Sequence, residues 1–61
     1  MKNKIWYAVM KDREDTDWGY GSFDLDEAKQ MAIDCGSEAY IAVIDDGEDP
    51  LCIGEIEQED F

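Results

Sequence analysis

The sequence of 61 residues contains no histidine, only two cysteines and one proline. Without histidine, the chain lacks the side chain that most often activates serine and cysteine nucleophiles. Two cysteines, Cys35 and Cys52, do not supply the four ligands of a structural zinc site. We therefore predict a protein that is not an enzyme and that carries no cofactor.

Long apolar runs are also missing. The N-terminal segment holds an apolar run of six residues, 5–10, which is too short for a membrane-spanning helix or a secretory signal. We expect a cytoplasmic protein without a membrane anchor. In that reducing compartment both cysteines remain free thiols. Their apolar sequence neighbours predict that Cys35 and Cys52 are small buried side chains.

Basic residues are scarce. Seventeen acids face five bases, the net charge is −12, and residues 37–61 contain no base at all. Proteins bind nucleic acid through Lys and Arg side chains that neutralise phosphates, and anionic membranes attract the same side chains. We therefore expect neither nucleic acid nor a membrane as a direct partner. A protein with a basic surface is the partner that this charge favours.

The apolar patterning predicts three strands. Residues 5–10, 39–44 and 51–56 are rich in apolar residues, many of them β-branched or aromatic, and polar or turn-forming residues follow each of them. Residues 18–23, "WGYGSF", either pair with the first strand as a short strand weakened by glycine or remain irregular. The first two of these strands are apolar on both faces, so each needs cover on both sides.

A helix is predicted over residues 25–35. Asp24 and Glu27, three positions apart, have the pattern of a capping box. Apolar residues then recur at helical spacing and form one stripe: Leu25, Ala28, Met31, Ala32 and Cys35. Gly36 suits the position that ends such a helix.

These elements predict an α+β fold in a single domain over residues 1–61. The expected order is β-(β)-α-β-β, with the helix packed on one face of a three- to four-stranded antiparallel or mixed sheet. The acidic tail, 57–61, either frays or folds back through Phe61. The second sheet face needs another cover, either the segment with Trp18 and Tyr20 or a second copy of the chain in a homodimer.

Three acids between the first strand and the helix are weak candidates for metal ligands. When Asp15 is counted as position 1 of a calcium loop, Asp17 and Asp26 fall at positions 3 and 12. Position 6 of such a loop requires glycine, and Tyr20 stands there. A solvated acidic turn explains the same residues, so we expect no metal site of established type.

The stretches "IWYAVMKDRED" and "GYGSFDLDEAKQMA", residues 5–15 and 19–32, resemble the start of HicB-type antitoxins. The shared features are a strand with Tyr and Ala-Val, an acidic turn, a second strand, and a helix opened by Leu-Asp-Glu-Ala. The resemblance covers about half of the chain and lacks the family's segment with proline and glycine between strand and helix. It implies a strand–strand–helix arrangement.

Charge and aromatic residues lead to three hypotheses of function. The first is a non-catalytic protein-binding module that imitates nucleic acid toward a basic nucleic-acid-binding protein. The second is a small self-associating structural or regulatory subunit that uses an apolar sheet face, and the third is a calcium-dependent module that uses Asp15 and Asp17. The candidate partner-binding residues combine two aromatics with a group of turn acids: Trp18, Tyr20, Asp45, Asp46, Glu48 and Asp49.

Overall fold

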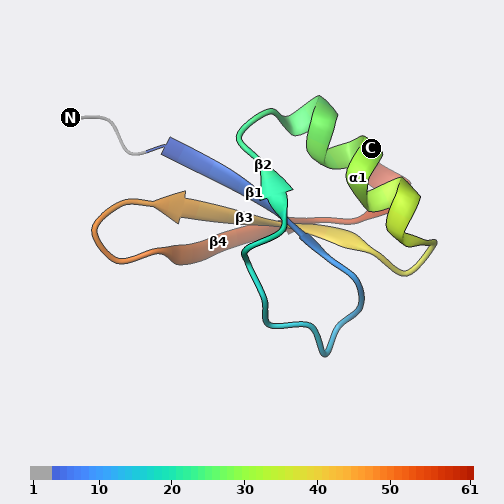
Figure 1. The fold of residues 1–61 in the computed structure, drawn as a ribbon, viewed down its shortest axis with the longest axis horizontal. Coiled ribbons are helices and arrows are strands. Elements are labelled where there is room, and N and C mark those ends of the chain that lie inside the picture. Colours follow the sequence, from blue (N-terminus) through green and yellow to red (C-terminus); the bar gives the residue numbers. More distant parts are fainter. Residues whose placement is uncertain (1–3) are drawn as a thin grey trace.

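In the described part of the chain, four antiparallel strands form one sheet in the order β2-β1-β3-β4, and the helix α1 lies across one face of that sheet (Figure 1). The computed structural model describes residues 4–61. The elements in chain order are β1 (Lys4–Met10), β2 (Gly21–Ser22), α1 (Leu25–Cys35), β3 (Tyr40–Asp46), β4 (Leu51–Ile56) and the short 3-10 helix η1 (Gln58–Asp60). The predicted α+β fold is confirmed, and the sheet is antiparallel throughout.

The two most apolar strands lie in the centre of the sheet. β1 and β3 pair along their whole length, from Lys4 opposite Asp46 to Met10 opposite Tyr40. Both strands are apolar on both faces and therefore require cover on both sides, and at the centre of the sheet residues of α1 pack on one face while Trp18 packs on the other. The edges are formed by the glycine-containing β2 and by β4, whose N-terminal half is exposed.

β2 is only two residues long and depends on a glycine. Gly21 lies opposite Ala8, and the backbone N–H of Val9 donates to the Tyr20 carbonyl at 2.7 Å. A Cβ atom at Gly21 would overlap the Tyr7 carbonyl oxygen and lie 2.9 Å from the Ala8 Cα. The segment 18–23, for which the sequence left two possibilities open, therefore forms a very short strand because glycine allows this close approach.

The helix spans the predicted residues, and local signals set both of its ends. The Asp24 carboxylate accepts hydrogen bonds from the N–H groups of Asp26 at 2.9 Å and Glu27 at 3.5 Å. The reciprocal bond of a capping box is absent within the described chain, because the Asp24 N–H donates to Ser22 Oγ at 3.0 Å. Gly36, with φ of 129°, ends the helix.

Each sheet face has its own apolar cluster. On the helix face, residues of β1, α1 and β3 are buried together: Val9, Ala28, Ala32, Ala39 and Ile41. On the opposite face the buried residues are Ala8, Met10, Tyr40, Ala42 and Ile44, and the partly buried Trp6 and Trp18 pack against them. The loop between β1 and β2 therefore brings Trp18 onto the second face, so the same chain supplies a cover there.

The C-terminal segment folds back onto the helix face. The Gln58 side-chain amide donates to the carbonyls of Gly36 at 2.5 Å and Ala39 at 3.0 Å, beyond the helix C-terminus. Phe61 packs against the apolar cluster of that face, and the Lys29 ammonium lies 6.0 Å from its ring centre. Of the two courses left open for residues 57–61, the structure shows the return of Phe61.

Candidate partner-binding surface

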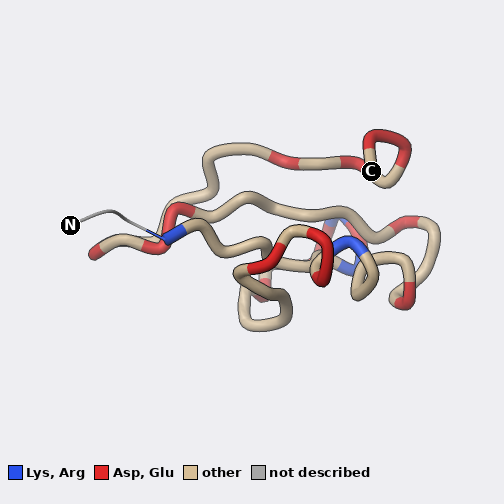
Figure 2. The backbone as a smooth tube through the Cα atoms, turned by 90° about the horizontal axis from the view of Figure 1, so that it is seen from above, with Lys and Arg blue, Asp and Glu red and all other residues tan. Residues whose placement is uncertain are grey.

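Carboxylates lie along the whole length of the molecule. Figure 2 shows acidic positions at the end with the β3–β4 turn, along the helix and near the C-terminus. The longest Cα dimension is 35 Å. At the turn, which we call the hairpin tip, Asp46, Glu48 and Asp49 are exposed and Asp45 is partly buried. The structure therefore groups the four turn acids that the sequence singled out.

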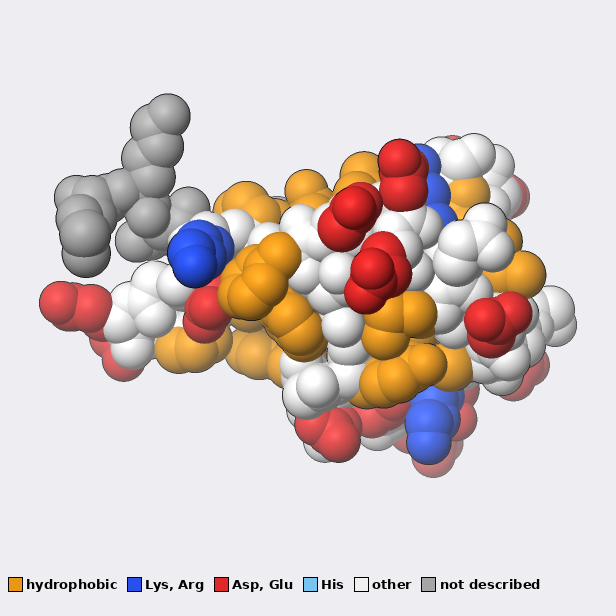
Figure 3. All heavy atoms as spheres, turned by 45° about the horizontal axis from the view of Figure 1, so that its top comes forward, with side chains coloured by type: hydrophobic (Ala, Val, Ile, Leu, Met, Phe, Trp, Pro, Cys, Tyr) orange, Lys and Arg blue, Asp and Glu red, His pale blue; other side chains and the backbone are white. Residues whose placement is uncertain are grey.

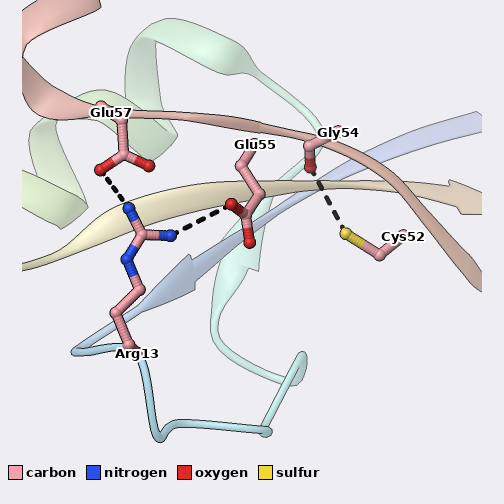
Figure 4. Close-up of polar contacts among 5 residues, drawn as sticks. All are labelled: Arg13, Cys52, Gly54, Glu55 and Glu57. Atoms are coloured by element: carbon pink, nitrogen blue, oxygen red, sulfur yellow. Dashed lines mark hydrogen bonds and ion pairs between the residues drawn. The ribbon is translucent and has the colours of Figure 1, made fainter.

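Arg13 and Lys4 contact other side chains of the molecule. The Arg13 guanidinium pairs with Glu55 at 3.1 Å and with Glu57 (Figure 4), and it lies 4.0 Å from the ring centre of Tyr40. Hydrogen bonding to Glu57 is the main cause that raises the pKa of Arg13 above its usual range. Lys4 lies over the ring of Phe23 at 5.5 Å. The charge of Arg13 is thus partly balanced by two carboxylates of β4 and the segment after it.

A second acidic region surrounds a groove at the other end of the sheet. The groove has a volume of about 730 Å³ and lies between the β1–β2 loop, the helix C-terminus and the tail. Carboxylates of all three segments line it: Asp12, Glu14, Glu38, Glu57 and Glu59. Arg13, which pairs with Glu57, also lines the groove, and its positive charge balances part of the negative charge of the groove.

The loop acids organise backbone rather than gathering as metal ligands. The Asp15 carboxylate accepts from the N–H groups of Lys11 at 3.0 Å and Asp17 at 2.9 Å, and these bonds lower the pKa of Asp15. Asp17 accepts from the Gly19 N–H at 2.8 Å. Within residues 4–61, no three His, Cys, Asp or Glu side chains converge as a metal-binding group, so Asp15, Asp17 and Asp26 are not brought together as one.

The structure separates the two candidate aromatic residues. Trp18 packs on the second sheet face, and its carbonyl accepts from the Trp6 indole N–H at 2.7 Å. Tyr20 remains 46% exposed. The sequence placed both on one face of an extended segment, but the chain turns at residues 18–20 and is extended only at β2. Tyr20 is therefore the one of the pair whose ring is available to a partner.

Both cysteines are exposed, so the expectation of two buried thiols is wrong. Cys35 is the last residue of α1 and lies beyond the helix positions that pack on the sheet, Ala28 and Ala32. Cys52 lies on the edge strand β4, where its thiol donates to the Gly54 carbonyl at 3.4 Å. Apolar sequence neighbours do not bury a residue at the end of a helix or on an edge strand.

Sequence reasoning missed an incompletely covered part of the helix face. An 11-residue helix is about 16 Å long, whereas a seven-residue strand is about 23 Å long. β1 and the β3–β4 hairpin project past α1 (Figure 1). The difference between the predicted helix and strand lengths was the available signal. It indicates that one end of the sheet lacks a helix above it.

The part of the chain described here contains no helix that is long and apolar enough to cross a membrane. Comparison with protein-family models, with curated proteins and with solved structures finds no match for this chain. The candidate site is therefore defined by its own charge, exposure and contacts.

Proposed function

We propose that this protein is a non-catalytic module that binds a protein with a basic surface and takes the place of nucleic acid on it. The observation that carries the proposal is a net charge of −12 on a molecule 35 Å long, or about one charge per 3 Å. DNA carries about one charge per 3.4 Å along a single strand and per 1.7 Å along the duplex. The charge density of this protein thus falls in the range of nucleic acid.

Contacts of three basic side chains with other residues of the molecule support the proposal. Arg13 is bound to Glu55 and Glu57, and Lys4 and Lys29 lie over aromatic rings. A basic groove would therefore meet mainly carboxylates. Electrostatic attraction of this kind speeds association and weakens as salt rises.

The self-association hypothesis has lost the argument that suggested it. The second sheet face was expected to be covered either by the segment with Trp18 and Tyr20 or by a second copy, and its buried residues pack against the chain's own Trp6 and Trp18. Each copy also carries a net charge of −12, so two copies repel each other at moderate salt. A partner of opposite charge is favoured over a second copy.

Affinity capture tests the proposal. The protein is immobilised, exposed to an extract of its source cell at low salt, and eluted first with a short DNA duplex and then with NaCl. We expect basic nucleic-acid-binding proteins to be released by the duplex, because both ligands occupy the same surface. Captured proteins that resist excess duplex and high salt would contradict the proposal.

Two matched variants show whether a particular surface is used. The hairpin variant carries Asp46→Asn, Glu48→Gln and Asp49→Asn, and the control variant carries three substitutions elsewhere on the exposed surface: Asp26→Asn, Asp34→Asn and Asp60→Asn. Both lose three negative charges. The hairpin variant should capture less partner protein than the control variant does. Equal losses would show that only the total charge matters.

A further inference from the structure

The incompletely covered sheet surface at the hairpin end is apolar around one carboxylate. In the strand register, Ile5 lies opposite Asp45 and Asp45 opposite Leu51, while Tyr7 lies opposite Val43. Side chains in register share a face, and Tyr7 packs with the helix-face cluster. We call the four apolar residues around Asp45 the open sheet end. Leu51 is 63% exposed, and the other three are only partly buried.

Figure 3 shows this side of the molecule. Exposed apolar side chains lie between the helix region and the projecting hairpin, and acidic side chains lie at the outer end. A hollow of about 360 Å³ adjoins the surface, lined by Lys4, Ile5, Tyr7 and Phe23. A hollow of this size beside apolar residues suits an apolar anchor side chain.

Asp45 has an unusual environment within the open sheet end. Its Oδ1 atom is buried and has no hydrogen-bond partner among residues 4–61. A buried oxygen without a donor destabilises the free protein. The nearest strand neighbours of Asp45 across the sheet, Ile5 and Leu51, offer only apolar side chains. The Asp45 side chain as a whole is only partly buried, so a rotation of its carboxylate would let a donor from outside the described chain bind this oxygen.

The charges around the open sheet end select a basic occupant. Asp46, Glu48 and Asp49 lie at its outer rim, and none of them has an ion pair with a described residue. Lys4 lies opposite Asp46, but its ammonium is placed over the Phe23 ring. Lys or Arg side chains of a partner would therefore find carboxylates at the rim and at Asp45.

We propose that the open sheet end binds an amphipathic basic helix of a partner protein. An apolar sheet face is buried against another layer of secondary structure, which in an α+β fold is formed by helices; such a helix would lie next to α1 and complete that layer. A partner could also add a strand to the edge strand β4. This is less favourable, because the pairing of β4 with β3 contains a bulge at Val43 and Ile44 of β3. A second copy of this chain would bring identical acidic rims together. The inference rests on the proposed function and adds the surface and the partner segment to it.

A model peptide tests the inference. The probe is a short amphipathic helical peptide of leucine and lysine, with a scrambled peptide of the same composition as control, and binding is followed by NMR of the backbone amides. We expect the amphipathic peptide to shift Ile5, Val43 and Leu51 most. We expect smaller shifts on the opposite face, at Ala42 and Trp18. The scrambled peptide should bind more weakly and without this pattern.

Substitutions at exposed positions sharpen the test without disturbing the core. Leu51→Lys should weaken peptide binding about tenfold or more, because it removes apolar contact and adds repulsion. Ile33→Lys, at a similarly exposed apolar residue of α1, should have a much smaller effect. Asp45→Asn should weaken binding while leaving the free protein equally or more stable, which a purely structural role would not produce.

The outcomes separate the two proposals. Salt-sensitive binding with shifts spread over all acidic regions, unaffected by Leu51→Lys, would overturn the inference and leave the proposed function standing. Absence of binding of the amphipathic peptide would also overturn it, and the capture experiment then decides the proposed function by itself. Sedimentation showing a dimer that Leu51→Lys dissociates would assign the open sheet end to a second copy and overturn the inference.

Discussion

At the scale of single residues, Asp15 shows how a carboxylate can be used for structure rather than for a ligand. Both of its oxygens accept backbone N–H groups, from Lys11 and Asp17, and its pKa is lowered mainly by the bond from Lys11. The loop that carries Trp18 to the second sheet face is therefore shaped by this side chain.

The free energy of unfolding of the Asp15→Asn variant should differ from that of the natural protein by an amount that depends on pH. The pKa of Asp15 is lower in the folded chain than the usual value of about 3.9. The stabilisation is therefore complete at neutral pH and is lost as the pH falls through the lowered pKa. Urea unfolding should show the variant to be less stable at pH 7, with the gap closing below about pH 4. A gap of constant size would refute the role given to this carboxylate.

Gly21 is the residue on which β2 depends. Alanine at this position would place its Cβ against the backbone of Tyr7 and Ala8, so the strands must separate. We expect Gly21→Ala to destabilise the fold by about 1–3 kcal/mol in urea unfolding. Gly54→Ala is the matched control, because nothing lies within 4 Å of a Cβ there, and it should leave stability nearly unchanged. Equal effects of the two substitutions would contradict the close approach.

At the scale of elements, the loop between β1 and β2 acts as a cover for the second sheet face. Trp18 packs on the apolar cluster and accepts the Trp6 indole bond, while Tyr20 is largely in solvent. We expect Trp18→Ala to cost about 2 kcal/mol or more in denaturant unfolding and Tyr20→Ala much less. If Tyr20→Ala were the more damaging change, the assignment of the cover would be wrong.

The elements differ in how far the sequence could predict them. The helix was predictable because its signals are local: Asp24 as the cap, an apolar stripe, and Gly36 at the end. The cover of the second face and the return of the tail depend on contacts between distant residues. Arg13 meets Glu55 across 42 positions, and Gln58 meets Gly36 across 22. No pattern within a short window encodes such contacts.

The candidate site was only partly predictable for the same reason. The turn acids, Asp45 to Asp49, are visible in the sequence as a charge run. The predicted lengths of helix and strands indicate that part of the sheet is uncovered, but the place of this part and the buried state of the Asp45 oxygen depend on where α1 lies over the longer strands. The hairpin tip was predictable, whereas the apolar surface beside it requires the fold.

At the scale of the whole molecule, the net charge of −12 should oppose folding through self-repulsion. Salt screens this repulsion. Salt also weakens attractive ion pairs, but in the described chain these are few and all involve Arg13. We therefore expect the unfolding temperature to rise when NaCl increases from about 20 mM to about 500 mM. An unfolding temperature that falls over this range would show that attractive charge pairs dominate.

The central claim is that the acidic surface occupies the nucleic-acid-binding surface of a basic protein. The most direct measurement is displacement of a fluorescent DNA duplex from a captured partner, followed by anisotropy as this protein is added. The account predicts displacement at about one equivalent, weakening steeply with salt, and impaired more by the hairpin variant than by its charge-matched control. A partner that keeps its DNA while bound to this protein would contradict the claim.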